Sequence, residues 1–113
     1  NYTEVKLWNY ESERFKPTGL QFCGLIMGDH SKCSINTMFN TGTVVGVSAN
    51  IYGSGFPRNF IPSFSWGNSK TNFELDKALE VASQVLQRRG KELSKEDKDI
   101  LAHIFNSTQV YRG

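Results

Sequence analysis

The sequence predicts a mainly β protein with an α-helical tail: a short parallel β-helix of hexapeptide repeats, preceded by a hairpin and followed by two helices. Between Met27 and Phe56 a bulky apolar residue recurs every six positions, and a small residue follows each one four positions later. After residue 70 the pattern changes to a helical period. The apolar positions are Met27, Cys33, Phe39, Val45 and Ile51, and the small positions are Ser31, Thr37, Thr43, Ala49 and Gly55.

The six-residue spacing has a direct physical interpretation. Repeats of this length build parallel β-helices, in which each hexad supplies one short strand and one turn of a triangular coil. The first residue of a hexad then points into the axis of the coil, and only a small side chain fits at the fifth position near the corner. From Gly19 to Phe56 the repeat makes about two coils. The interpretation requires the first-position side chains to be interior, and its alternative is a β-sandwich with glycine-rich turns.

Residues 1–16 precede the repeat and predict a hairpin. Val5 and Leu7 alternate with polar residues, and the charged run ESER comes before Phe15, which is typical of two short strands joined by a turn. Residues 57–70 follow the repeat and contain two prolines and three aromatic residues. They predict an ordered loop whose aromatic side chains cover the helical tail or a neighbouring subunit.

The segment 71–113 predicts two antiparallel helices. Thr71 with Glu74 forms a capping box, and the helical period that follows ends at Gly90. Ser94 with Asp97 forms a second box. The second helix has an apolar stripe made of Ile100, Leu101, Ile104 and Phe105. The chain therefore divides into residues 1–70, with the hairpin, the repeat and the loop, and residues 71–113, a helical hairpin.

The composition argues against a nucleic-acid-binding protein and against a membrane-spanning one. The chain has 113 residues, enough for one domain, and a net charge of +2 that no stretch concentrates, which argues against a nucleic-acid partner. The apolar stretches are far too short to span a bilayer, so no membrane partner is expected. Cys23 and Cys33 are ten residues apart without a CxxC motif. The sequence therefore predicts a cytoplasmic protein in which both cysteines are reduced core residues.

Both ends of a short solenoid need covering, because each coil buries its inner face mainly against its neighbours. The predicted helices would cover the end that follows the repeat. The end before Gly24 has no such cover, and the chain opens at Asn1 without a methionine. The sequence thus favours a fragment that further coils precede in a longer protein.

Two runs carry a resemblance to a known family: GLIMGDHSKCSINTMFNTGTVVG, residues 24–46, and GFPRNFIPSFSWG, residues 55–67. Together with their flanks they resemble the C-terminal left-handed β-helix of bacterial sugar-1-phosphate nucleotidyltransferases. The nearest branch is the bifunctional N-acetylglucosamine-1-phosphate uridylyltransferase/glucosamine-1-phosphate acetyltransferase family, in a form that ends in a helical tail. The resemblance covers essentially the whole chain, and it implies the left-handed coil and a homotrimer.

The resemblance also implies chemistry that lies outside this chain. In the family an N-terminal Rossmann-like domain transfers the nucleotide with Mg²⁺ and binds the sugar phosphate, and no glycine-rich phosphate loop is present here. The acetyltransferase half binds acetyl-CoA along the coil, beside a neighbouring subunit. Its catalytic histidine lies upstream of the region matched by Asn1. The chain is therefore expected to hold no catalytic residue and no metal ligand, and to be inactive alone.

Four candidate cofactor-binding residues, Ser34, Ile35, Gly53 and Ser54, match positions where the family touches the coenzyme, largely through main-chain atoms. The chain departs from the family at Ile35, where a small polar residue is expected. The fifth candidate, Arg58, could meet a phosphate through charge-assisted hydrogen bonds. Its alternative role is to lay its aliphatic stem over the aromatic residues with its charged head in water.

The two histidines are weaker candidates. His30 lies at the fourth position of a hexad, where the repeat turns it outward beside a turn, so a role as a proton acceptor is not favoured. His103 lies between Leu101 and Phe105 in the second predicted helix and is expected to be a packing or surface residue. Two histidines and two cysteines without close spacing do not predict a zinc site.

Three functional hypotheses follow. The chain is the C-terminal part of a sugar-1-phosphate nucleotidyltransferase with an acetyltransferase half, to which it contributes trimer contacts and one wall of the acyl-donor cleft. Alternatively it is a non-catalytic oligomerisation or regulatory β-helix of a glucose-1-phosphate nucleotidyltransferase. A stand-alone hexapeptide acyltransferase is the third hypothesis, and the lack of a suitably placed histidine argues against it.

Overall fold

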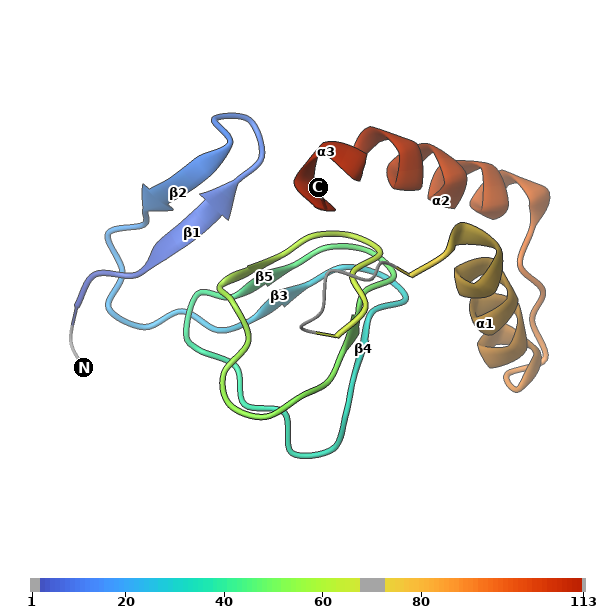
Figure 1. The fold of residues 1–113 in the computed structure, drawn as a ribbon, viewed down its shortest axis with the longest axis horizontal. Helices are drawn as coiled ribbons and strands as arrows, with labels where there is room; N and C mark the ends of the chain where they lie inside the picture. The colour runs from blue at the N-terminus through green and yellow to red at the C-terminus, as the bar shows by residue number, and fades with distance from the viewer. Residues whose placement is uncertain (1–2, 68–72, 113) are drawn as a thin grey trace.

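The computed structural model describes residues 3–67 and 73–112, and the fold is drawn in Figure 1. A strand hairpin lies at one side, short parallel strands form the middle, and the helices lie at the other side, with the last helix returning toward the hairpin. The strands are β1 (Lys6–Asn9), β2 (Arg14–Pro17), β3 (Ile26–Met27), β4 (Lys32–Cys33), β5 (Val44–Val45), β6 (Asn50–Ile51) and β7 (Phe60–Ile61), and the helices are α1 (Leu75–Gln87), α2 (Lys95–Ser107) and α3 (Gln109–Arg112).

The predicted hairpin is confirmed. Strands β1 and β2 pair antiparallel, with Lys6 opposite Pro17 and Asn9 opposite Arg14. The Asn9 side chain accepts a hydrogen bond from the Ser12 backbone N–H at 2.9 Å, which closes the turn. Val5 is buried at the base of the hairpin. Its backbone N–H donates to the carbonyl oxygen of Leu20 at 2.7 Å, so the chain that leaves the hairpin is held beside the chain that enters it.

The middle of the molecule consists of two small parallel sheets. One has three strands in the order β3-β5-β7, and the other has two, β4 and β6. Ile26 pairs with Val44, 18 residues further on, whereas Val44 pairs with Phe60 after only 16 residues. The change of spacing shows that the six-residue register does not continue beyond β6.

The predicted short left-handed parallel β-helix is wrong. The structure has an antiparallel pair, a three-stranded parallel sheet and a parallel pair, and no closed coil forms in the described residues. Each strand of the parallel sheets is two residues long. The segments 34–43 and 52–59, which would have to supply the third side of each coil, contain turns and irregular backbone without strand structure. Two sheets without a third side cannot enclose an axis.

The burial of the five residues that begin the hexads shows why the six-residue pattern predicted the wrong fold. Met27 is 38% exposed and Cys33 is also exposed, so neither is a core residue. Within the described part of the chain, both belong to strands that pair with a neighbour on one side. Val45 and Ile51 are buried, and Phe39 packs partly buried against their cluster. Burial follows from the number of neighbours that cover a strand, and the spacing along the chain does not contain that information.

Two helices form where they were predicted, but Figure 1 shows α2 running across α1 and not antiparallel to it, and one cap also differs. Thr71 lies outside the described residues, and the N-cap of α1 is Glu74, which makes no side-chain capping bond. The second box forms its expected hydrogen bond, since the Ser94 hydroxyl accepts from the Asp97 N–H at 3.1 Å. Gly90 follows α1 with a φ of 69°, a conformation that favours glycine. The short helix α3 was not predicted.

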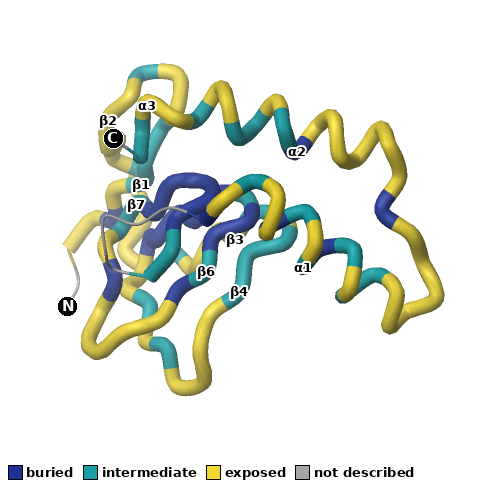
Figure 2. Tube along the Cα trace, turned by 45° about the vertical axis from the view of Figure 1, so that its right-hand side comes forward, coloured by how far each residue is buried: buried dark blue, intermediate teal, exposed yellow. Residues whose placement is uncertain are grey.

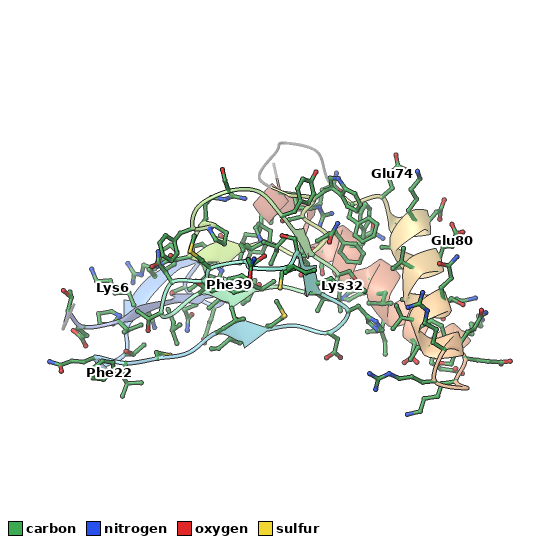
Figure 3. All side chains as sticks on the ribbon, turned by 90° about the horizontal axis from the view of Figure 1, so that it is seen from below. Lys6, Phe22, Lys32, Phe39, Glu74 and Glu80 are labelled. Atoms are coloured by element: carbon green, nitrogen blue, oxygen red, sulfur yellow. The ribbon has the colours of Figure 1, made fainter. Side chains whose placement is uncertain are left out.

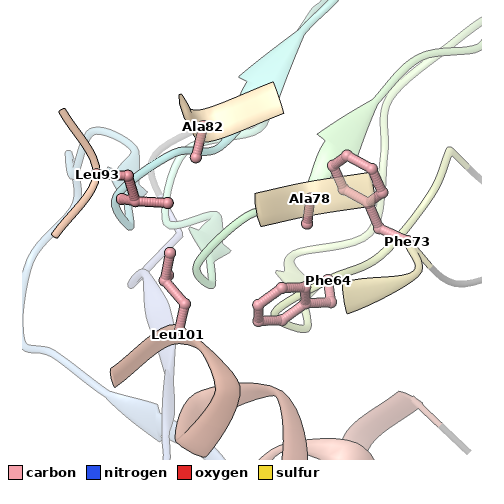
Figure 4. Packing of buried hydrophobic residues seen from close by; sticks show 6 residues of the cluster. All are labelled: Phe64, Phe73, Ala78, Ala82, Leu93 and Leu101. Atoms are coloured by element: carbon pink, nitrogen blue, oxygen red, sulfur yellow. The ribbon is translucent and has the colours of Figure 1, made fainter. Parts of the chain in front are cut away.

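The largest hydrophobic cluster joins the strand region to the helices. Phe64 is fully buried in it, and Figure 4 shows its ring beside Phe73, Ala78 of α1 and Leu101 of α2. Figure 2 places the other concentration of buried chain in the parallel strands. The cluster comprises Phe64, Phe73, Ala78, Ala82, Leu93 and Leu101. The prediction that loop aromatics cover the helical tail is therefore confirmed for Phe64.

Arg112 connects α3 to the strand region and to α2. Its guanidinium donates to the carbonyl oxygen of Ser63 at 3.1 Å, to the hydroxyl of Thr108 at 2.8 Å and to the carbonyl oxygen of Phe105 at 2.6 Å. The guanidinium carbon also lies 4.5 Å from the centre of the Phe105 ring. Burial lowers the pKa of this arginine. The charge is thus held by hydrogen bonds to three oxygen atoms and by the face of an aromatic ring.

Candidate functional site

The most promising site is a cleft of about 930 Å³ between the hairpin and the parallel strands. We call it the hairpin cleft. It lies in the range of volumes typical of small-molecule sites. Its walls come from residues between 3 and 15, from the turn before β5 and from the chain that leads into and begins β7. The lining residues are Thr3, Glu4, Val5, Lys6, Phe15, Thr41, Arg58, Asn59 and Phe60.

The hairpin cleft combines an apolar wall with two cations. Val5, Phe15 and Phe60 provide aliphatic and aromatic surface, and Lys6 and Arg58 provide the positive charges. Glu4 is the acidic residue of the lining, and its carboxylate already accepts a hydrogen bond from the Gly19 N–H at 2.6 Å. Such a lining suits a ligand with an apolar body and an anionic end, because arginine and lysine form charge-assisted hydrogen bonds with phosphate.

An aromatic cluster supports the wall that Phe60 forms. The Trp8 ring stacks on the Phe60 ring, with 4.2 Å between ring centres and 7° between planes. Tyr10, Phe15 and Tyr111 meet these rings edge to face. The indole N–H of Trp8 is buried and has no hydrogen-bond partner among the described residues. The hairpin, the β7 strand and α3 thus meet in one cluster directly behind the cleft.

The aromatic cluster makes stability depend on pH in the alkaline range. Burial, and secondarily the neighbouring Tyr111, raise the pKa of the Tyr10 phenol. Since the folded pKa lies above the unfolded one, the associated stability is present below about pH 10 and is lost as the pH rises through the folded pKa. We expect the unfolding free energy, from urea titrations, to fall more steeply above about pH 10 in the wild type than in Tyr10→Phe. Parallel curves for the two proteins would contradict this expectation.

The structure brings four of the five predicted binding residues to one end of the β4-β6 sheet. Ser34 and Ile35 follow β4, and Gly53 and Ser54 follow β6. The Ser34 N–H donates to the carbonyl oxygen of Ile51 at 2.9 Å, which places the two turns side by side. All four residues are exposed. Because the backbone N–H of Ser34 already donates to Ile51, it is not free to bind a ligand. The Ser34 hydroxyl lies 3.1 Å from the Thr37 hydroxyl.

Arg58 is the predicted residue that lines the hairpin cleft. The sequence did not indicate its companions Lys6 and Phe15, because they belong to the hairpin, more than 40 positions earlier in the chain. The available signal was the alternation of Val5 and Leu7 with polar residues such as Lys6, but nothing in that pattern says what the strand will face. Only the fold brings the two cations to one cleft.

The remaining candidates lie elsewhere. His30 is in a turn with a φ of 61°, and its carbonyl oxygen accepts a hydrogen bond from the Lys32 ammonium at 3.2 Å. His103 is exposed on α2. Cys33 is an exposed free thiol and Cys23 is half-buried, so the prediction that both are core residues is wrong. Among residues 3–67 and 73–112 no three His, Cys, Asp or Glu side chains form a group that could hold a metal ion.

Two further observations bear on partners. In the part of the chain that the structure describes, no helix has the length and apolar character needed to cross a membrane. Comparison of the chain with protein-family models, with curated proteins and with solved structures gave no match.

Proposed function

We propose that this chain is the C-terminal part of a cytoplasmic sugar-1-phosphate nucleotidyltransferase, and that its hairpin cleft binds the phosphate-bearing part of acetyl-CoA. The observation that carries the proposal is the origin of the cleft wall. The run GFPRNFIPSFSWG, one of the two on which the family resemblance rests, supplies Arg58, Asn59 and Phe60 to the cleft. A motif that resembles an acetyltransferase segment thus coincides with the site that offers cations beside apolar surface.

The chemistry of the lining supports acetyl-CoA over smaller anions. Coenzyme A carries phosphates at one end and a long, largely uncharged arm at the other. Lys6 and Arg58 can pair with the phosphates, while Val5, Phe15 and Phe60 can cover part of the arm. The described lining contains no histidine, and its one carboxylate, that of Glu4, already accepts a hydrogen bond from the Gly19 N–H. The role proposed for this chain is therefore to bind and orient the acyl donor, and the sugar phosphate and the Mg²⁺-dependent step belong to other parts of the protein.

The proposal predicts that Arg58→Gln weakens acetyl-CoA binding about tenfold or more, since a hydrogen bond to a charged group contributes roughly 1.5–3 kcal/mol. Isothermal titration of the purified chain with acetyl-CoA measures the affinity. Arg88→Gln is the matched control, because Arg88 is an exposed arginine just after α1, outside the cleft lining. Equal affinities of the two variants, or no binding by the folded wild type, would refute the proposed site.

The second candidate is a non-catalytic role in assembly or regulation of a glucose-1-phosphate nucleotidyltransferase. One observation favours it: several large apolar side chains on and around β3 and β4 are exposed, which is typical of a surface that another polypeptide covers. The same titration separates the two candidates. A folded chain that self-associates but gives no heat with acetyl-CoA favours assembly, whereas binding that depends on Arg58 favours the acyl-donor role.

A further inference from the structure

We propose that Tyr111 is a positioning residue of the hairpin cleft: its ring holds the hairpin and β7 together, and through it the helix α3 sets the affinity of the cleft for its ligand. The effect on affinity rests on the proposed function, whereas the effect on the two walls does not. The hairpin contributes Lys6 and Phe15 to the lining of the cleft. The chain that leads into and begins β7 contributes Arg58 and Phe60.

The helix α3 brings the helical tail back to the hairpin cleft. In Figure 3, Lys6 of the hairpin lies toward one end of the molecule, and Glu74 and Glu80 lie with α1 at the other end. After α1 and α2 the chain returns toward the hairpin in α3 (Figure 1). The Arg112 guanidinium donates to the carbonyl oxygen of Ser63, two residues after β7, at 3.1 Å. The helical tail is thus fixed to the chain that follows β7.

Tyr111 contacts both walls with one ring. Its ring centre lies 5.8 Å from that of Phe60, 6.1 Å from that of Trp8 and 5.7 Å from that of Tyr10. The ring planes in these pairs are between 76° and 84° apart, which is the edge-to-face geometry that aromatic pairs favour. Phe60 belongs to β7, whereas Trp8 and Tyr10 belong to the hairpin. Tyr111 therefore connects the two walls, in addition to the stack of Trp8 on Phe60.

The ring contacts also position the cation of the hairpin. Lys6 and Trp8 are two positions apart on β1, so their side chains leave the same face of the strand. Phe15 is paired with Trp8 across the hairpin and shares that face. If the Trp8 ring moved away from Phe60, Lys6 and Phe15 would move with it, because they belong to the same pair of strands. The distance between Lys6 and Arg58, the two cations of the lining, therefore depends on the rings behind the cleft.

The first measurement is the fluorescence of Trp8 in a Trp66→Phe background, which leaves Trp8 as the one tryptophan of the chain. The indole N–H of Trp8 is buried and has no hydrogen-bond partner in the described residues, so the emission reports water that enters the cluster. We expect Tyr111→Ala to shift the emission to longer wavelength and to increase its quenching by acrylamide. Tyr111→Phe keeps the ring and should match the background protein. Val110→Ala is the control on α3, because Val110 is 75% exposed.

The second measurement is isothermal titration of the same variants with acetyl-CoA. We expect Tyr111→Ala to bind about fivefold more weakly than Val110→Ala, the effect of losing about one edge-to-face contact. Tyr111→Phe should restore the affinity. Arg112→Gln, which releases α3 from Ser63, is an independent variant with the same expected results as Tyr111→Ala. Far-ultraviolet circular dichroism checks that each variant keeps its helices.

Two results would overturn the proposal. The first is an unchanged Trp8 emission in folded Tyr111→Ala and Arg112→Gln, which would show that α3 does not hold the walls. The second is a changed emission with an undiminished affinity for acetyl-CoA, which would show that the rings do not position the cleft for its ligand. If the wild type binds no acetyl-CoA, the proposed function fails, and the Trp8 emission alone decides whether Tyr111 holds the hairpin against β7.

Discussion

Replacing Gly46 with alanine should destabilise the fold by about 3 kcal/mol, the upper part of the range for inserting an extra methyl group into a packed core. A Cβ atom at position 46 would lie 2.5 Å from the backbone nitrogen of Ser63 and 2.8 Å from its Cα. Both are backbone atoms and cannot rotate away. They also belong to the chain just after β7, which the Gly46 N–H helps to position by donating to Ile61 at 2.8 Å.

Gly24→Ala is the matched control for this substitution. A Cβ atom there would meet nothing within 4 Å, and Gly24 is not among the glycines with positive φ. We expect its effect to stay within about 0.5 kcal/mol, as for most surface substitutions. Urea unfolding followed by circular dichroism measures both variants against the wild type. If Gly46→Ala and Gly24→Ala unfold at the same urea concentration, the close approach of Gly46 to Ser63 has no energetic importance.

Phe64→Ala should cost about 3–5 kcal/mol, the usual loss for removing a buried phenylalanine side chain. Phe64 is 0% exposed, and its ring meets the Phe105 ring edge to face, with 5.1 Å between ring centres. Its backbone carbonyl also accepts from the Phe73 N–H at 2.8 Å, at the start of the helical region. Loss of the ring therefore removes the largest fully buried side chain from the contact between the strand region and the helices.

Phe56→Ala makes the same chemical change at a residue that is 58% exposed, and we expect a much smaller loss of stability. The measurement is again urea unfolding, together with the near-ultraviolet circular dichroism of the aromatic residues, which should weaken in Phe64→Ala. A Phe64→Ala protein as stable as Phe56→Ala would mean that the helices are held by other contacts.

Local signals in the sequence predicted local structure correctly. The hairpin follows from alternation before a polar turn, and the second helix follows from Ser94, whose hydroxyl accepts from Asp97 as expected. These elements depend on residues within a few positions of one another. Their hydrogen bonds and caps can therefore be predicted without knowledge of the rest of the fold.

The long-range architecture could not be predicted in the same way. The hexad spacing treats Met27 and Val45 as equivalent, yet Met27 lies on an edge strand and Val45 on a strand with neighbours on both sides. Phe64 has a φ of 60°, a backbone conformation that is rare for an aromatic residue and that no local pattern announces. Both properties depend on which distant segments pack there.

For the candidate site, too, the local features could be predicted from the sequence and the long-range ones could not. Arg58 was identifiable from its motif and its charge, and the structure places it in the hairpin cleft. Lys6 and Phe15 were not identifiable, because their importance comes from the docking of a hairpin onto a strand some 50 positions later. Charge type can be read from a sequence, whereas the meeting of two charges in one cleft is a property of the fold.

The contact between the Trp8 and Tyr111 rings, 6.1 Å apart between centres, has a consequence for the order of events during synthesis. Contacts between residues far apart in sequence form late, because a long stretch of chain must be ordered before they are made. A ribosome delivers Trp8 long before Tyr111. The aromatic wall behind the cleft is therefore complete only after α3 has emerged from the ribosome.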